Sequence, residues 1–237
     1  MKLSAPIPQL KRRARLLARN ERIPLHMALD QIARGEGFAG WSLLSARIGS
    51  RAIAWDILSQ LSEGDMIVLG ARPGHGKTLL GLQLLLDATR IGRRGIFFTL
   101  EYTEREAHAR IQSLRDASSD LGQMPEIVTS DKICADYIMR HLARADRGTV
   151  AVIDYLQILD QRRNEPELSA QLASLKNFAQ ETGAILAFIS QIDRSYDPSI
   201  KPLPDMRDIR LPNPVDMGAF SKTCFLHEGK MRFQAMA

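Results

Sequence analysis

A lysine and a threonine at the end of a glycine-rich stretch are the residues of this chain best placed to do chemistry. The run Ala71-Arg72-Pro73-Gly74-His75-Gly76-Lys77-Thr78 follows an apolar stretch, Met66–Leu69, and precedes a helix-like stretch that begins at Leu79. Strand, glycine-rich loop, Lys-Thr and helix in this order predict a phosphate-binding P-loop. In such a loop the backbone N–H groups and the helix N-terminus cradle the phosphates of a nucleotide.

The side chains of this run have separate roles in the predicted site. Lys77 can reach the β- and γ-phosphates, and the Thr78 hydroxyl can ligate Mg²⁺. Ala71 stands where the pattern G-x-x-x-x-G-K-[ST] has its first glycine, with Gly70 one residue earlier. The residues predicted to contact the nucleotide are Arg72, Pro73, Gly74, His75, Gly76, Lys77, Thr78 and Leu79.

Asp154 is the first of three polar residues that follow apolar runs. It ends the stretch Thr149–Ile153, which is suited to a buried strand. A carboxylate in this place beside a P-loop can hold the Mg²⁺ that neutralises the β- and γ-phosphates. Apolar runs that end in Asp are common, so the assignment depends on the pairing with Lys77 and Thr78. We therefore predict Thr78 and Asp154 as the metal ligands.

Glu101 and Gln191 follow two other apolar runs. A carboxylate on the ligand side of the sheet can orient and deprotonate the attacking water. A neutral amide there can touch the γ-phosphate and report its loss to the loop behind it. The local pattern does not decide the role of Glu101, which could equally cap the helix that starts at Glu104. For Gln191 the pattern alone favours a polar residue that merely ends a strand.

These residues need a framework of alternating strands and helices, and the chain from Gly64 onward predicts one. The expected strands are Met66–Leu69, Gly95–Thr99, Glu126–Thr129, Thr149–Ile153, Ala184–Ile189 and Lys222–Leu226, with Lys230–Gln234 closing an antiparallel hairpin. The expected helices are Leu79–Arg90, Glu104–Arg115, Ala135–Ala145 and Glu167–Glu181. This alternation predicts an α/β fold with a mostly parallel sheet and a ligand site at the carboxyl ends of the strands. Five prolines predict a loop over Arg194–Asp216.

Composition bounds the class of protein. With 237 residues, 45% of them hydrophobic, the chain can bury a full core, and we expect one domain with a small appendage. The longest apolar runs are far too short to span a bilayer, and the N-terminus lacks the apolar core of a signal peptide, so no membrane partner is expected. Cys134 and Cys224 have no ligand-like neighbours, which predicts free thiols in a cytoplasmic protein.

The positive charge of the chain gathers near its N-terminus. Residues 1–50 carry nine Lys or Arg and three Asp or Glu, whereas the net charge of the whole chain is +5. Apolar residues at helical spacing predict a small basic helical module here. Its first helix either grips nucleic-acid phosphates or is a solvated face that packs on the main domain or a partner. The pattern favours the second alternative, because no aromatic residue interleaves the basic ones.

Five motifs in order resemble the ATPase domain of DnaB-type replicative helicases. They are Ala71-Arg72-Pro73 before Gly76-Lys77-Thr78, Phe98-Thr99-Leu100-Glu101, Ile153-Asp154-Tyr155-Leu156-Gln157, Leu175-Lys176 and Ser190-Gln191-Ile192-Asp193-Arg194. Their order and approximate spacing match over about residues 60–226. The resemblance implies a RecA-like P-loop NTPase fold over residues 51–237, preceded by the module of residues 1–50. It also accounts for Ala71, because this family often lacks the first glycine.

The resemblance implies a role for each predicted site residue. Lys77 and Thr78 would bind the phosphates of ATP and Mg²⁺, Glu101 would be the catalytic base, and Asp154 would lie on the metal side. Gln191 would sense the γ-phosphate, so that Lys77, Glu101 and Gln191 form the expected catalytic set. The implied activity is ATP hydrolysis coupled to DNA replication, with single-stranded DNA and further copies of the chain, as a hexamer, as partners.

Departures from the family pattern keep a second function open. Only about 50 residues precede the ATPase region, where family members carry a large domain that engages primase. The family also places a Lys-x-Arg pair before Asn-Gly in the neighbour's active site, whereas Phe233 follows Lys230-Met231-Arg232 here. The alternative is an ATP-dependent regulatory or accessory protein of the same fold without helicase activity. A third possibility is a module whose P-loop only holds nucleotide structurally, against which the full set of acidic and basic site residues argues.

Overall fold

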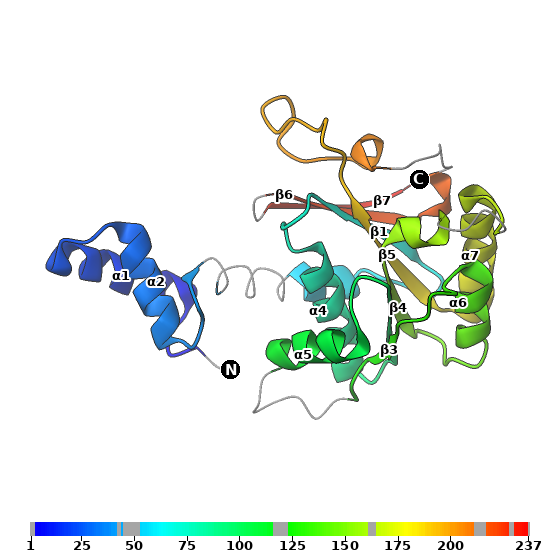
Figure 1. The fold of residues 1–237 in the computed structure, drawn as a ribbon, viewed down its shortest axis with the longest axis horizontal. Coiled ribbons are helices and arrows are strands. Elements are labelled where there is room, and N and C mark those ends of the chain that lie inside the picture. Colours follow the sequence, from blue (N-terminus) through cyan, green and yellow to red (C-terminus); the bar gives the residue numbers. More distant parts are fainter. Residues whose placement is uncertain are drawn as a thin grey trace.

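A seven-stranded sheet forms the centre of the larger part of the chain (Figure 1). The computed structural model describes residues 3–41, 44, 53–115, 123–160, 165–210, 217–227 and 230–236. The strands are β1 (Met66–Ala71), β2 (Gly95–Thr99), β3 (Glu126–Val128), β4 (Val150–Asp154), β5 (Ile185–Gln191), β6 (Lys222–His227) and β7 (Lys230–Ala235). Their order in the sheet is β3-β2-β4-β5-β1-β6-β7, and every neighbouring pair is parallel except β6 and β7. The predicted α/β fold and its closing hairpin are confirmed.

Helices cover both faces of this sheet. They are α4 (Lys77–Arg90), α5 (Glu104–Leu114), α6 (Ala135–Leu142) and α7 (Leu168–Thr182), and residues 53–58 are also helical. Short 3₁₀ turns lie at η1 (Leu156–Asp160), η2 (Met206–Asp208) and η3 (Met217–Ala219). In Figure 1, α4 and α5 lie on one side of the sheet and α6 and α7 on the other. The helix after β1 and the helix after β4 thus leave the sheet on opposite faces, which opens a ligand position between the carboxyl ends of these strands.

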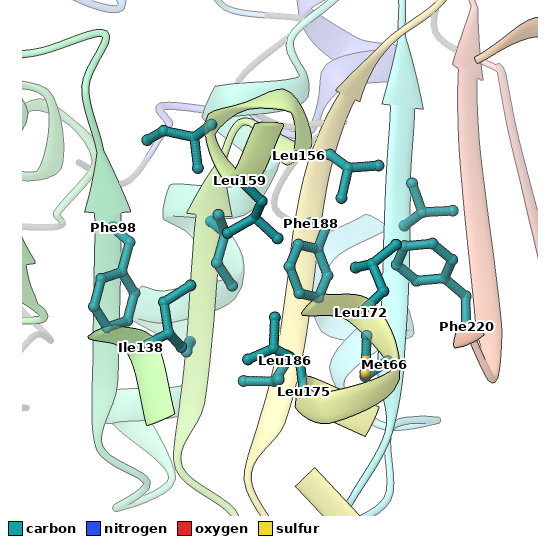
Figure 2. Close-up of a cluster of buried hydrophobic side chains, with 14 of the residues drawn as sticks. Met66, Phe98, Ile138, Leu156, Leu159, Leu172, Leu175, Leu186, Phe188 and Phe220 are labelled. Atoms are coloured by element: carbon teal, nitrogen blue, oxygen red, sulfur yellow. The ribbon is translucent and has the colours of Figure 1, made fainter. Parts of the chain in front are cut away.

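Two apolar clusters hold the helices on the sheet. Figure 2 shows one of them, in which Phe98, Phe188 and Met66 of three strands face Ile138 of α6 and Leu172 of α7. The cluster on the opposite face joins α4, α5 and residues 53–58 to the sheet. Because both faces are covered, the central strands are apolar throughout rather than alternating. This double burial explains why unbroken apolar runs in the sequence marked the strands.

The N-terminal helices form a separate pair with its own small core. They are α1 (Ile7–Glu21) and α2 (Leu25–Gly35), and in Figure 1 they lie apart from the sheet. Fully buried side chains come from both helices and from the segment after them: Leu10, Ala14, Ala28, Ala33 and Leu44. The predicted helical module is therefore present over the described residues. The predicted third apolar face includes Phe38, Trp41 and Leu44, whereas residues 42–43 and 45–50 lie outside the described part of the chain.

Most element boundaries agree with the sequence prediction to within a few residues, and two of the differences concern the site. Helix α4 begins at Lys77 instead of Leu79, because Gly76 ends the loop as the residue before the helix. Strand β5 continues to Gln191, past the predicted end at Ile189. None of the described helices is long and apolar enough to cross a membrane.

Candidate functional site

The glycine-rich run forms a tight loop between β1 and α4. Gly74 and Gly76 have φ angles of +81° and +85°, which lie in the left-handed region that favours glycine. No atom lies within 4 Å of a Cβ placed at either position, so backbone conformation, not space, calls for glycine here. The His75 N–H donates to the Arg72 carbonyl at 3.1 Å, which closes a turn. Free N–H groups at the start of α4 then face the region in front of the loop, as phosphate binding requires.

Ala71 causes no strain in place of the missing glycine. It is the last residue of β1 and is fully buried, paired with Gln191 of β5. Its backbone is extended, so the position does not call for the left-handed conformation that glycine adopts easily. The departure from the P-loop pattern at this residue is therefore compatible with the loop geometry.

Thr78 and Asp154 meet in the structure as predicted for a metal site. The Thr78 hydroxyl donates to Asp154 Oδ2 at 3.1 Å. The other oxygen, Oδ1, is buried and has no hydrogen-bond partner among the described residues. Burial, and next the charge of Glu101, raise the pKa of Asp154 to about 7, while Thr78 and Lys77 act in the opposite direction. A buried carboxylate with one free oxygen is a fitting ligand for a divalent cation.

Glu101 lies on the ligand side of the sheet, beyond the end of β2. The register pairs Thr99 of β2 with Asp154 of β4, and Glu101 follows two residues later. The buried Thr99 hydroxyl accepts a hydrogen bond from the Glu101 N–H at 3.1 Å, which fixes the backbone at this turn. The Glu101 side chain is exposed, and its charge reaches Asp154 closely enough to raise that residue's pKa. The cap of α5 is instead made by Thr103 and Glu106, so the capping alternative for Glu101 is wrong.

Gln191 stands beside the P-loop through strand pairing. Its partner across the ladder is Ala71, the last residue before the loop, and its side chain is partly exposed. Its carbonyl accepts from the Arg210 N–H at 2.8 Å, which ties the strand end to the returning loop. The position suits an amide that contacts the terminal phosphate and is connected to the segment behind it.

Arg72 uses its side chain differently from the other loop residues. Its guanidinium donates to the carbonyls of Arg194 at 3.0 Å and of Tyr196 at 2.6 Å, and lies 5.5 Å from the centre of the Tyr196 ring. In this conformation only the backbone of Arg72 is available for the predicted nucleotide contact. Its side chain instead binds the loop after β5. Local sequence pattern could not reveal this contact, because the partners lie more than 120 residues away.

An imidazole stack beside the P-loop was not predicted. The His75 ring stacks on His227 at the end of β6, with ring centres 5.0 Å apart, and Tyr196 meets His227 edge-on at 5.4 Å. His227 is buried, and neither of its ring nitrogens has a hydrogen-bond partner among the described residues. The stack joins the P-loop to β6, the strand beside β1. No sequence signal marked His227, because histidine at a strand end is common and its partners come from distant segments.

Arg110 is a second residue near the site that the sequence pattern did not mark. It lies on α5 over the Tyr102 ring, with its guanidinium carbon 4.5 Å from the ring centre, and its charge lowers the pKa of Asp154. A cleft of about 410 Å³ opens beside Glu101 and is lined by Glu101, Tyr102, Glu106, Ala109, Arg110 and Ser113. The positive charge of Arg110 therefore partly offsets the negative charges of Glu101 and Asp154.

The donor set fits a nucleotide with Mg²⁺. Mg²⁺ in nucleotide sites takes one or two protein oxygens and completes its shell with water and phosphate oxygens. Thr78 and Asp154 supply such oxygens, while Lys77, at the start of α4, supplies a positive charge for the phosphates. Within the described ranges no group of three His, Cys, Asp or Glu side chains is arranged to hold a metal by itself.

Comparison with known proteins finds replicative helicases among the relatives of this chain. The replicative DNA helicase DnaB of Mycoplasma pneumoniae is 26% identical over 214 residues, which cover 73% of this chain and 45% of the helicase. DnaB of Mycoplasma genitalium is 24% identical over 235 residues, with 84% and 49% covered. The chain thus spans about half the length of the curated relatives it matches. No protein-family profile matches it.

Solved structures show the same fold. A DnaB-like replicative helicase superposes with a TM-score of 0.58 at 18% identity, covering 70% of this chain and 48% of the helicase. The ATPase domain of G40P superposes with a TM-score of 0.56 at 17% identity, covering 71% of each. The predicted RecA-like fold and the resemblance to DnaB-type ATPase domains are confirmed. The curated relatives named here are replicative DNA helicases.

Proposed function

We propose that this protein binds and hydrolyses ATP with Mg²⁺ and uses the energy on DNA, as a motor of the DnaB type. The single observation that carries the proposal is the meeting of Thr78 and Asp154 at 3.1 Å at the mouth of a glycine-rich loop. Two segments 76 residues apart in sequence supply the metal-binding pair that a P-loop NTPase needs. We place the protein in the cytoplasm.

The proposed roles follow from position. Lys77 and the N–H groups of Gly74 and of Gly76 to Leu79 hold the phosphates, since they surround the start of α4, whereas the His75 N–H closes the turn. Thr78 and Asp154 hold Mg²⁺, which, when bound, neutralises charge on the β- and γ-phosphates. Glu101 orients and deprotonates the attacking water, and Gln191 contacts the γ-phosphate.

Single-stranded DNA and further copies of the chain are the proposed partners. The support is the naming of the relatives as replicative DNA helicases. Gln191 and Arg72 both connect the P-loop to the segment after β5, through Arg210 in one case and Arg194 and Tyr196 in the other. Loss of the γ-phosphate would therefore alter the contacts of residues 192–210, the loop that follows β5. In a hexamer, Lys230 and Arg232 are the candidates for basic groups supplied to a neighbouring site.

Substitution at two site residues separates binding from hydrolysis. Lys77→Ala should abolish tight ATP binding, measured with a fluorescent ATP analogue, because a buried positive charge beside the phosphates is lost. Glu101→Gln should retain binding and lower turnover by about 10²–10⁴-fold, the usual contribution of a general base.

Glu104→Gln is the matched control for Glu101→Gln. Glu104 begins α5 three residues further on and is exposed, so the variant removes the same charge from the same segment without touching Asp154. It should hydrolyse ATP at close to the parent rate. Tight ATP binding by Lys77→Ala would refute the P-loop assignment, and equal turnover by Glu101→Gln and the parent would refute Glu101 as the base.

A further inference from the structure

The outer face of α1 is a stripe of arginines. Arg12, Arg15 and Arg19 follow one another at i, i+3 and i+7, so they share one side of the helix. All three are exposed, whereas Leu10 and Ala14, which lie on the opposite side, are buried against α2. The three arginines are spread over about 10 Å along the helix axis, because each residue rises about 1.5 Å. We call Arg12, Arg15 and Arg19 the arginine face.

Acidic side chains of the same module do not neutralise this face. Glu36 is buried and accepts hydrogen bonds from the backbone and hydroxyl of Ser4, and Asp30 accepts from the Trp41 N–H at 2.8 Å. Among the described residues no carboxylate forms an ion pair with Arg12, Arg15 or Arg19. Two of the three acids are thus used inside the module. The third, Glu21, is exposed at the end of α1, nine residues after Arg12 and therefore on the opposite side of the helix.

The helix pair already has a core that leaves the arginine face outside. Its inward side chains meet each other, as the full burial of Leu10, Ala28 and Ala33 shows. The alternative that the basic face packs on the sheet therefore has no support in the described residues, since Arg12, Arg15 and Arg19 are all exposed. A face of three exposed arginines without an ion-pair partner among the described residues fits an anionic partner outside the chain.

We propose that the arginine face of α1 binds the phosphate backbone of a nucleic acid, as a contact separate from the nucleotide site. Arginine supplies planar pairs of N–H donors that match phosphate oxygens, and the face has three arginines and no lysine. A nucleic-acid strand carries a charge every 3.4 Å or so, so about 10 Å of helix meets about three phosphates. The exposed Leu16 is the sole large apolar side chain on this face of the described helix, which disfavours insertion into a membrane.

The test is equilibrium binding of the full chain to labelled DNA without ATP. Single strands of about 30 nucleotides and duplexes of the same length show whether the face binds single-stranded or double-stranded DNA. Binding is measured over about 50 to 300 mM salt. The triple variant Arg12→Gln, Arg15→Gln, Arg19→Gln should bind at least one of them about tenfold or more weakly at 0.1 M salt. Its slope of log affinity against log salt should be shallower by about 2–3, as expected for three lost phosphate contacts.

Two further variants make the test specific. Lys132→Gln with Arg140→Gln and Arg144→Gln removes the same charge from exposed positions near α6 and should bind like the parent. Replacing the three face arginines by lysine keeps the charge but loses the paired donors. This variant should bind more weakly than the parent, less weakly than the glutamine variant, and with a salt slope near that of the parent. Basal ATP hydrolysis should be equal in all of them, so failure here is distinct from failure of the nucleotide site.

Three outcomes would overturn the proposal. One is an unchanged affinity and salt slope in the glutamine triple variant. Another is an equal loss in the control variant near α6, which would show a general charge effect. The third is tighter binding of the parent to anionic phosphatidylserine vesicles than to either DNA, lost in the triple variant, which would identify a membrane surface instead.

Discussion

Asp154 brings a carboxylate into the interior of the site without a complete set of partners. Thr78 donates to one oxygen, and the other has no partner among the described residues. Burial and the charge of Glu101 raise the pKa of Asp154 to about 7, so ionising it in the folded chain without a cation is unfavourable. A metal ion with nucleotide phosphates would supply the missing charge. The feature that lowers the stability of the nucleotide-free protein thus favours binding.

Asp154→Asn should stabilise the nucleotide-free protein in a pH-dependent manner. Below about pH 4 the carboxyl is protonated in both states, so the substitution changes little. As pH rises to 7 the unfolded chain ionises first, and the folded parent, whose carboxyl has a raised pKa, loses stability relative to the variant. The difference in the free energy of unfolding should reach on the order of a few kcal/mol at pH 8, as measured by urea unfolding.

The control for this comparison is Asp56→Asn, which changes an exposed carboxylate in the helical residues 53–58. Its effect should stay within about 0.5 kcal/mol at every pH, as is usual for surface substitutions. Mg²⁺ with ATP should stabilise the parent and have little effect on Asp154→Asn. A greater stability of the parent at pH 8, or a difference independent of pH, would contradict the buried charge.

Helix α4 lies unusually close to the sheet that it crosses. A Cβ atom on Gly81 would lie 2.9 Å from side-chain carbons of both Ile189 and Val152. Since the P-loop leads directly into α4, this contact helps to fix the position of Lys77 relative to the carboxyl ends of the strands. The position of the proposed phosphate site therefore depends on the packing of Gly81, one turn further along the helix.

Gly81→Ala should displace α4 and weaken ATP binding. Overpacking of this kind costs about 1–3 kcal/mol, and the higher helix propensity of alanine offsets about 1 kcal/mol. We expect a net loss of up to about 2 kcal/mol in unfolding free energy and a higher KM for ATP, measured by urea unfolding and steady-state kinetics. Gly35→Ala is the control, since Gly35 ends α2 and has nothing within 4 Å of its Cβ position. Equal effects of the two variants would contradict the packing argument.

The strands and the P-loop could be predicted because their signals are local. Apolar runs such as Val150–Ile153 are buried on both faces, and the sequence shows this directly. The meeting of Thr78 with Asp154 could be predicted only by combining the two motifs, because neither residue pattern is specific alone. The family resemblance then added roles for Glu101 and Gln191, and strand pairing places Gln191 beside the loop.

The contacts that escaped prediction join segments far apart in the chain. The Arg72 guanidinium lies over the Tyr196 ring, and the Tyr196 and His227 rings pack edge to face. No local sequence pattern predicts either contact. Within the proline-rich segment, Lys201 pairs with Asp205 and Asp208 at 2.9 and 2.6 Å, so its described part is held in place by ion pairs. Prolines predicted a loop here, but its internal bonds depend on a backbone path that the pattern does not encode.

At the scale of the whole molecule, charge and catalytic chemistry are separated. The arginine face belongs to α1, which packs with α2, whereas the acidic site residues belong to the sheet and its loops. The proposed nucleotide site lies at the carboxyl edge of the sheet, whereas the arginine face lies on the helix pair. A protein that holds DNA with one part and hydrolyses ATP with the other is consistent with this arrangement.

Steady-state ATP hydrolysis with Mg²⁺, with and without single-stranded DNA, tests whether this protein is an ATPase that acts on DNA. The assay compares the parent with Glu101→Gln and Glu104→Gln at low and at moderate salt. We predict that single-stranded DNA stimulates hydrolysis, and that hydrolysis depends on Glu101 but not on Glu104. A slow rate that DNA does not change would contradict the proposed action on DNA, and a rate that survives in Glu101→Gln would contradict the site itself.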